Sequence, residues 1–563
     1  MQFLRRHRAS LAALGAFLAV SFFYLGIPIV SHPQRDLIGY GHDPDLFAWM
    51  LAWWPHAVLH GTNPFVTHAV WYPQGANLAW ASSVPGLALF MAPVTLLGGP
   101  VLAYNALVIL LPALAAWTAF LLCRHLTHSF WPSLAGGYLF GFSPYVLGQT
   151  EGHPHMTSVF LIPLIALALV RYVQGTLTGA RFVVAVAVLL AFQLLFSTEL
   201  AFTLTLALVV SLVFAAILVP RSRRRLRLML LPLAAAYVGA GLITAPFLAY
   251  ALLHLQKGAL HPVSGYPADL LNPVIPTRLT ALGWSWTMSI ARHFKGNTAE
   301  NGAYLGVAWI AILGWFAWSF RRVAAARFLV ALLALGFVVE LGIRLEIGGD
   351  DSTTHMPWRL LYKLPLFNNI LPVRISMFVG LAACVCVAWW ASSPRAPRAA
   401  RVVLTALAIV MVVPNLWLGV WHRYPYRPAF FTQGIYRTCL RPDDNVLMLP
   451  FPNWTDAMVW QAESRFAFRM ANGYVAPGPP EGVPEREFIR SLEHGDVPKT
   501  PKRLLAWARA QGVTAILAAD DAQPWVHLLA PTQHARRIGG VYLFDLSGRR
   551  DRACRSVDRL AEQ

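Results

Sequence analysis

The chain is poor in charged residues for its length. Only 13% of its 563 residues are Asp, Glu, Lys or Arg, whereas 57% are hydrophobic. Soluble domains carry about 25% charged residues. A water-soluble fold of this composition would leave many apolar side chains exposed. The composition therefore excludes a soluble protein and indicates that lipid solvates most of the chain.

Several common signatures are also missing. No CxxC zinc pattern, P-loop or dinucleotide fingerprint stands in a suitable context, and only five cysteines occur. The 45 Lys and Arg outnumber the 26 Asp and Glu, but much of this positive charge sits in short clusters between apolar runs. This distribution predicts membrane lipids as partners and no nucleic acid.

The chain has instead a series of long apolar runs. A membrane-spanning helix needs roughly 20 apolar residues, and about eleven such runs are present. We therefore predict an α-helical polytopic membrane protein with about 11 transmembrane helices. Segment 85–97 is too short to cross and is expected to be re-entrant or interfacial. The runs cover residues 9–30, 101–123, 131–147, 156–172, 182–198, 200–220, 228–253, 304–320, 327–345, 376–392 and 402–421.

The gaps between these runs predict the orientation. Every second gap is basic, as in "RSRRRLR" at 221 and "RRVAAAR" at 321. Cytoplasmic loops carry such an excess of Lys and Arg, so the N-terminus is expected to be cytoplasmic and the C-terminus extracytoplasmic. Segment 9–30 is expected to be an uncleaved first span rather than a signal peptide, because no small-residue cleavage site follows it.

The chain changes character near residue 422, with more charge and short strand-like runs such as "NVLMLP" at 445 and "VYLFDL" at 541. We predict a transmembrane domain over 1–421 and a small soluble extracytoplasmic α/β domain over 422–563. Cys439 and Cys554 bracket the second domain. In an oxidising compartment they could form a disulfide that closes it, and the sequence leaves this open.

Acidic residues gather at the outer ends of the predicted spans. "GYGHDPDLFAWMLAWW" places Asp43 and Asp45 directly after the first span, and its tryptophans are typical of an interfacial belt, with a sugar-stacking platform as the alternative. "GQTEGHPHM" follows the third span. The acids and histidines at later exits are Glu151, His153, His155, Glu199 and Glu300.

These acids have two interpretations. Ionisable residues at membrane exits often mark function, and carboxylates on separate loops could converge on one pocket. An acid at a helix start is also often a simple cap, and a loop histidine can lie at the interface with no ligand role.

In this arrangement, over roughly residues 1–420, the chain resembles the GT-C superfamily of polytopic glycosyltransferases. The resemblance rests on one acidic motif after the first span, a second after the third, many further spans and a soluble outer C-terminal domain. "WRLLYKLPLFNNILPVRIS" and the tail segments "VLMLPFPNW" and "VWQAESRFAFRMANGY" also resemble bacterial multi-span proteins placed near that superfamily.

The resemblance implies an enzyme of the bacterial inner (cytoplasmic) membrane that takes a sugar from a polyprenyl phosphate carrier at the outer face. The family's base or acceptor-orienting acid in the first outer loop corresponds to Asp43 or Asp45. Glu151 matches the second motif, which aids metal binding or acceptor positioning in some members. His153 stands where some members place a second carboxylate. No cofactor is therefore certain, and a divalent metal stays open, since His and Glu both ligate such ions.

The phosphate that leaves with the lipid carrier needs a cation. An arginine fork matches phosphate oxygens, and Arg374 in "LPVRIS" stands where the tenth span begins. Ordinary snorkelling of a basic side chain at a helix end is the alternative. Segment 356–371 is expected to lie in the interface and to line a lipid groove. The candidate phosphate-binding residues are Arg374, Arg359, Lys363 and Arg292.

The sequence thus favours a membrane hexosyl- or pentosyltransferase that moves a sugar from a polyprenyl-phosphate carrier to an envelope glycan, lipid or protein. Two other classes stay open. A transporter or flippase of lipid-linked saccharide would favour internal repeats and charges at the membrane midplane, which are scarce here. A non-catalytic envelope scaffold is not excluded by any sequence feature.

Overall fold

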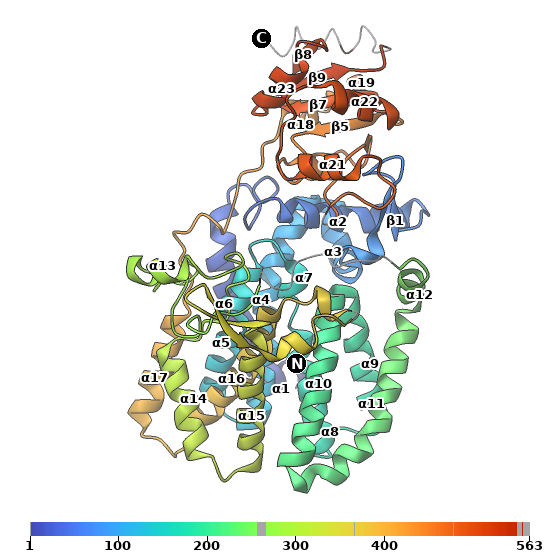
Figure 1. Cartoon of the computed structure of the whole chain (residues 1–563). Coiled ribbons are helices and arrows are strands. Elements are labelled where there is room, and N and C mark those ends of the chain that lie inside the picture. Colours follow the sequence, from blue (N-terminus) through green and yellow to red (C-terminus); the bar gives the residue numbers. More distant parts are fainter. Residues whose placement is uncertain (1, 256–265, 365, 477, 549–553, 555–563) are drawn as a thin grey trace. The chain divides into compact units, whose positions relative to one another are not determined.

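The structure, a computed structural model, describes residues 2–255, 266–364, 366–476, 478–548 and 554 (Figure 1). The chain divides into two compact units. The first contains Met1–Val30, Ala106–Leu248 and Lys257–Trp421, and the second contains Ser31–Asn105, Ala249–Gln256 and His422–Gln563.

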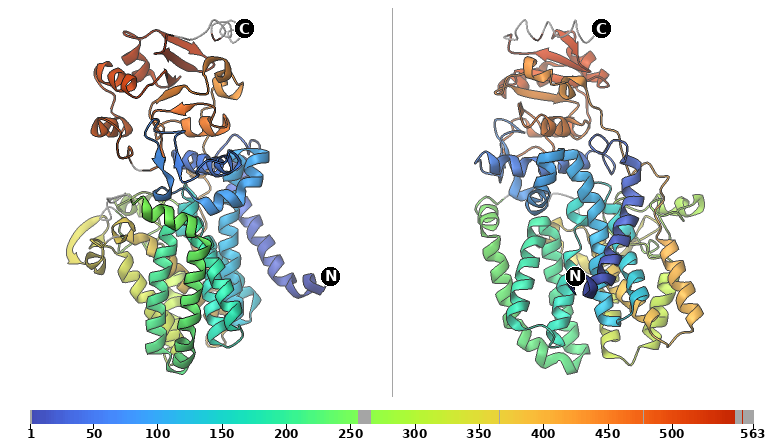
Figure 2. Two further views of the ribbon diagram at one scale, coloured as in Figure 1. Left: turned by 90° about the vertical axis from the view of Figure 1, so that its right-hand side faces the viewer. Right: turned by 180° about the vertical axis from the view of Figure 1, so that it is seen from behind.

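The first unit is mainly helical. Figures 1 and 2 show helices α9, α10 and α11 side by side. The bounds are α1 Gln2–Ser21, α4 Pro100–Thr127, α5 Phe130–Gly141, α6 Pro144–Gln149, α7 Pro154–Thr157, α8 Leu161–Val173, α9 Gly179–Phe196, α10 Thr198–Leu218, α11 Arg223–Ile243, α12 Ala245–Leu253, α13 Ser285–Ala291, α14 Val307–Ser319, α15 Ala324–Glu340, α16 Ser376–Ser392 and α17 Arg398–Met411. Strands β3 Arg344–Ile347 and β4 Asp350–His355 pair as an antiparallel hairpin.

Local sequence explains where these helices begin. The Ser197 hydroxyl accepts a hydrogen bond from Leu200 N at the start of α10, and the Ser143 hydroxyl accepts one from Val146 N at the start of α6. Such caps satisfy amide groups that a helix start leaves unpaired. Close packing also needs small residues, since a Cβ on Gly141 of α5 would lie 2.4 Å from the Ala116 Cβ of α4.

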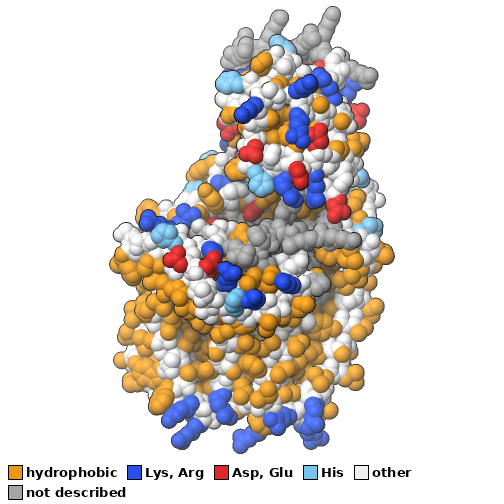
Figure 3. Space-filling model, in the orientation of Figure 1, with side chains coloured by type: hydrophobic (Ala, Val, Ile, Leu, Met, Phe, Trp, Pro, Cys, Tyr) orange, Lys and Arg blue, Asp and Glu red, His pale blue; other side chains and the backbone are white. Residues whose placement is uncertain are grey.

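Among the described residues, seven helical stretches are long and apolar enough to cross a membrane. They confirm a multi-pass helical membrane protein. Helix α14, with 13 residues, is shorter than such a span, and α17 has 14 residues, so the count of eleven stays a prediction. Figure 3 shows hydrophobic side chains over much of the first unit and Lys and Arg side chains gathered at one end of it. The seven stretches are Arg8–Ile29, Pro100–Thr127, Pro154–Val173, Gly179–Phe196, Thr198–Leu218, Pro220–Ile243 and Pro372–Ser392.

The second unit combines a five-stranded sheet with short helices. The strand order is β6-β5-β7-β9-β8, in which β5 runs parallel to β6 and β7, whereas β9 runs antiparallel to β7 and β8. The bounds are α2 Asp43–Leu59, β1 Val66–Thr67, β2 Ala76–Asn77, α3 Pro85–Gly98, α18 Ala429–Thr432, α19 Tyr436–Cys439, β5 Asn445–Leu449, α20 Ala457–Glu463, β6 Arg469–Met470, α21 Arg486–Glu493, α22 Lys502–Ala510, β7 Ala515–Ala519, α23 Gln523–Leu529, β8 Ala535–Ile538 and β9 Val541–Asp545.

The strand-like runs at 445 and 541 form β5 and β9 in the structure. Cys439 and Cys554 are joined by a disulfide across 115 residues of chain. The domain boundary differs from the prediction, however. Residues 31–105, expected within the membrane domain, group with the tail, because Ala69 and Trp71 bond to Met470 and Asn472 beside β6.

The tryptophans of the first loop also differ from the prediction of an interfacial belt. Trp49, Trp53 and Trp54 are at most 7% exposed. The Trp49 indole donates to Gln461 Oε1 of α20 at 2.7 Å, and its ring meets Phe466 edge to face. These residues therefore belong to the core of the second unit, and the sugar-stacking alternative fails for the same reason.

Candidate functional site

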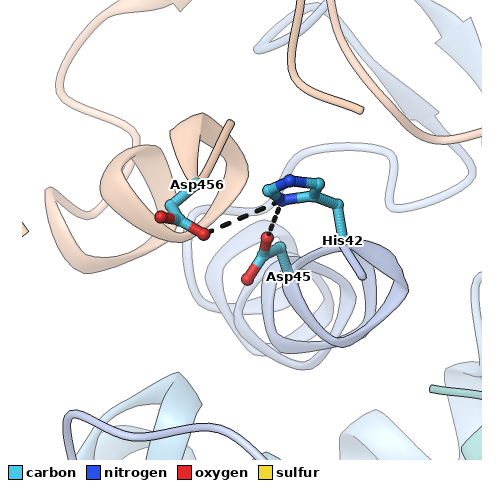
Figure 4. Close-up of side chains that lie close together, drawn as sticks. All are labelled: His42, Asp45 and Asp456. Atoms are coloured by element: carbon cyan, nitrogen blue, oxygen red, sulfur yellow. Dashed lines mark hydrogen bonds and ion pairs between the residues drawn. The ribbon is translucent and has the colours of Figure 1, made fainter. Parts of the chain in front are cut away.

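The strongest polar cluster of the second unit joins three segments that are far apart in sequence. The Arg423 guanidinium bonds to both oxygens of Asp45 and to Asp456 Oδ1. His42 Nδ1 lies 2.8 Å from Asp45 Oδ2 and 3.7 Å from Asp456 Oδ1 (Figure 4). Asp45 is completely buried, and Asp456 is 6% exposed. One arginine thus bridges two buried carboxylates beside an imidazole.

Local structure explains how each member is held. Asp45 lies in the first turn of α2, where Pro44 suits the start of a helix and the helix dipole favours acids. The backbone of Arg423 pairs with that of Leu37 in an antiparallel bridge. Asp456 precedes α20, in the segment that follows the carboxyl end of β5, and its Oδ2 accepts from Tyr426 N at 2.6 Å.

Burial and charge set the protonation of this cluster. Burial raises the pKa of Asp45 to about 6, although the hydrogen bond to His42 and the charge of Arg423 act in the opposite direction. Asp45 and Asp456 share the single guanidinium of Arg423. Asp45 is therefore best suited to holding Arg423 and His42 in place, because its side chain has no contact with solvent.

His42, Asp45 and Asp456 also form a group whose ligand atoms lie within 4.8 Å of one another, close enough to hold a metal ion. A divalent ion would stand between the two carboxylates, where the Arg423 guanidinium already lies. The residues therefore do not fit a metal while Arg423 keeps its position, since the arginine itself supplies the cation.

Asp43 differs from Asp45 in its surroundings. It is half-buried, and its Oδ1 accepts a hydrogen bond from the Tyr474 hydroxyl. Burial, together with the nearby negative charge of Asp43, holds the pKa of Tyr474 well above its usual range, so the phenol stays a donor. Of the two predicted acids, Asp43 is the one that reaches solvent.

A second polar cluster lies in the first unit. Arg374 Nη1 donates to Glu199 Oε2 at 2.5 Å, and its Nε lies 3.1 Å from Glu300 Oε2. Gln149 Nε2 donates to the same Glu300 oxygen at 3.2 Å. Burial alone would raise the pKa of Glu300, but the charge and hydrogen bonds of Arg374 lower it, with a contribution from His153. The structure thus brings together three predicted acids and bases, Arg374, Glu199 and Glu300.

Glu151 follows Gln149 of this cluster by two residues, and it is 7% exposed. Burial raises its pKa to about 7, while Arg278 and His153 act in the opposite direction. The His153 and His155 rings meet edge to face with their centroids 5.9 Å apart. A carboxyl group with a pKa near neutrality can take or give a proton, as a general acid or base must.

The predicted phosphate-binding residues have two kinds of environment. Arg374 is neutralised by two carboxylates, so a phosphate there would meet like charge. Arg359, Lys363 and Arg292 are exposed. Arg359 stands beside Leu360, which is 81% exposed, whereas Trp358 is buried.

The chain matches one family model over most of its length. The model, described as Domain of unknown function (DUF6311), covers residues 12–413. The chain belongs to the DUF6311 family. No curated protein matches it.

Solved structures show the fold of this DUF6311 protein. Arabinofuranosyltransferase AftD from Mycobacteria matches with a TM-score of 0.58 and 15% identity, over 96% of this chain and 40% of that one. The DUF6311 protein thus spans well under half of AftD. Oligosaccharyltransferase AglB from Archaeoglobus fulgidus, in complex with an inhibitory peptide and a dolichol-phosphate, matches with a TM-score of 0.54 and 11% identity, over 96% and 74%. An oligosaccharyltransferase from Archaeoglobus fulgidus in a complex with Zn and sulfate matches with a TM-score of 0.53 and 11% identity, over 95% and 73%.

These neighbours are GT-C glycosyltransferases, so the resemblance found in the sequence is confirmed at the level of the fold. In the DUF6311 protein, sequence reasoning found Asp45 but missed Arg423, Asp456 and Tyr474. Those residues follow residue 421, and no local pattern ties them to the first loop. Two quoted tail segments point to them, because "VLMLPFPNW" ends two residues before Asp456 and "VWQAESRFAFRMANGY" ends at Tyr474.

Proposed function

We propose that this protein is a membrane glycosyltransferase that moves a sugar from a polyprenyl-phosphate carrier to an envelope glycan, lipid or protein at the outer membrane face. The observation that carries the proposal is the environment of Asp43. It is a half-buried carboxylate in the first turn of α2, directly after the first span of a GT-C fold, and Tyr474 orients it. The dolichol-phosphate bound by AglB supports a lipid-linked donor.

In the proposed reaction, Asp43 accepts the proton of an acceptor hydroxyl. The hydroxyl oxygen forms a bond to the anomeric carbon of the sugar, the bond from that carbon to the phosphate oxygen breaks, and polyprenyl phosphate leaves. Tyr474 donates a hydrogen bond to Asp43 Oδ1 and thereby fixes the orientation of the carboxylate. A positioned base of this kind contributes about 10²–10⁴-fold to the rate.

Asp45 acts in this proposal as a positioning residue. It lies two residues from Asp43 on the same helical turn, and Arg423 holds it to Asp456. The start of α2 is thus tied to the loop after β5. No step of the reaction is assigned to a metal, because Arg423 occupies the place of the cation.

The exposed bases of residues 356–371 are proposed to meet the donor. Arg359 and Lys363 are exposed beside the exposed leucines Leu360 and Leu364. A basic and apolar segment of this kind suits a lipid whose phosphate lies at the interface. Arg374 is better placed to hold Glu199 and Glu300 than to bind phosphate.

The decisive experiment uses Asp43→Asn in membranes supplied with radiolabelled polyprenyl-phosphate sugars. Asparagine keeps an oxygen that accepts from Tyr474, so the variant retains the fold but has no base. We expect transfer to fall at least about 100-fold. Asp350→Asn, a change of the same kind at an exposed residue of the β3–β4 hairpin, is the control. Transfer that stays within twofold in both variants overturns the proposal.

One observation favours the scaffold alternative. Both central arginines, Arg374 and Arg423, are already neutralised by carboxylates of their own unit, as in purely structural networks. A scaffold predicts that cells carrying only the Asp43→Asn variant keep the normal envelope glycan profile, although cells without the protein lose it. The enzyme predicts the same loss in both.

A further inference from the structure

A cavity of about 340 Å³ lies at the ends of two helices of the first unit. It is lined by Leu121, Arg124, His125, His128, Leu167 and Arg171. Arg124 and His125 stand in the last turn of α4, and Arg171 stands in the last turn of α8. Every polar side chain of the lining is basic, and none belongs to the clusters described above.

We propose that this cavity binds the phosphate of an anionic phospholipid. Two helix C-termini contribute roughly −0.5 charge each. The two arginines contribute two positive charges, so about one positive charge remains in the cavity even with both imidazoles neutral. Arg171 makes no side-chain hydrogen bond or ion pair with any residue that the structure describes, which leaves its guanidinium fork available for phosphate oxygens.

The backbone conformation of His128 also supports a binding site. His128 follows α4 with a φ of 54°, in the left-handed region that glycine favours at the end of a helix. The turn returns the His128 carbonyl to Arg124, which donates to it, and sets the His128 ring 6.5 Å from that of His125. A strained non-glycine residue that lines a cavity is consistent with a binding role.

The apolar part of the lining decides between a lipid and a soluble anion. Leu121 and Leu167 belong to the same helices as the arginines, and those helices lie in stretches long and apolar enough to span a membrane. A phospholipid places acyl chains beside such leucines and its phosphate beside the arginines. Basic pockets between the ends of membrane helices recognise anionic head groups by this chemistry.

Arginines at a helix C-terminus also have a plain structural role, since they bond to the last carbonyls. Arg124 does this with His128 O, but Arg171 does not bond to any carbonyl of the described chain. The structural role therefore accounts for one arginine of the cavity and leaves the other unexplained.

The test uses the full chain in a zwitterionic detergent and counts bound phosphatidylglycerol or phosphatidylcholine by native mass spectrometry. We expect phosphatidylglycerol to bind and phosphatidylcholine to bind weakly. Removing both charges in Arg124→Gln/Arg171→Gln should weaken phosphatidylglycerol roughly 30-fold, at about 1 kcal/mol per arginine. The control, Arg224→Gln/Arg322→Gln, removes the same charge at two exposed arginines outside the cavity.

Equal losses in both double variants, or equal binding of the two lipids, would overturn the proposal. The third measurement uses inorganic phosphate. The lipid assignment is refuted if inorganic phosphate binds through the same arginines and phosphatidylglycerol does not bind. Should the double variant fail to fold, Arg171→Gln alone replaces it, because no described residue depends on that side chain. It is expected to weaken phosphatidylglycerol roughly fivefold.

Discussion

Arg423→Gln is the most informative change in the second unit. It removes the only charge that separates Asp45 from Asp456 in their cluster, and both carboxylates are buried. Leaving a buried charge without its partner typically costs about 3–5 kcal/mol. Protonation limits this cost. Because the pKa of Asp45 is already about 6, neutralising it at pH 7 costs only about 1.4 kcal/mol.

We therefore expect Arg423→Gln to destabilise the second unit by about 2–4 kcal/mol at pH 8 and by less at pH 5. The sign follows from the raised pKa of Asp45. The folded state keeps a proton that the unfolded state loses, so stability falls as the pH rises through the folded value. In thermal unfolding of the full chain, about 3 kcal/mol corresponds to a midpoint lower by roughly 6–12 °C for a unit of this size.

Arg503→Gln is the matched control, because Arg503 pairs with Glu485 on the surface, where both side chains are more than one third exposed. Surface pairs contribute about 0–1 kcal/mol. Asp45→Asn and Asp456→Asn added to Arg423→Gln should restore most of the loss, since no buried charge then remains. The reasoning is refuted if Arg423→Gln lowers the midpoint no more than Arg503→Gln does.

Two further predictions concern the tail. Burial raises the pKa of Glu493 to about 8 against the charges of Arg490 and Arg486, so stability should fall between about pH 5 and pH 8 by up to about 4 kcal/mol. Glu493→Gln should remove most of this dependence of stability on pH. The prediction is contradicted if the urea midpoint changes equally between pH 5 and pH 8 in the wild type and in the variant. The disulfide between Cys439 and Cys554 closes a long loop, so Cys439→Ser should destabilise the unit by about 2–5 kcal/mol. A urea midpoint of the wild type that does not respond to a reducing agent would refute this.

Features that depend on neighbouring residues could be predicted from the sequence. Apolar runs of span length mark most of the helices, and short strand-like runs mark the strands β5 and β9. The acids that follow the spans were found because charge is so rare in the runs themselves. Asp43 and Glu199 both lie in first helical turns, where the capping interpretation and the functional one share the same residue types.

Features that depend on distant residues could not be predicted. Arg423 follows Asp45 by 378 residues, and a carboxylate and an arginine so far apart carry no pairing signal. The tryptophans of α2 show the same limit. Their composition is equally typical of a membrane interface and of a core, and their burial together with the contact of Trp49 with Gln461 decides for the core.

The two halves of the second unit are synthesised at very different times. Residues 31–105 leave the ribosome first, and His422 follows more than 300 residues later. At about 5–20 residues per second, that delay is roughly 15–60 s. During this interval Trp49 and Trp53 have no Phe466 to cover them, and Asp45 has no arginine. The nascent first loop then exposes apolar side chains and an unpaired carboxylate. A chaperone or the lipid surface is expected to cover them until the last quarter of the chain has been synthesised.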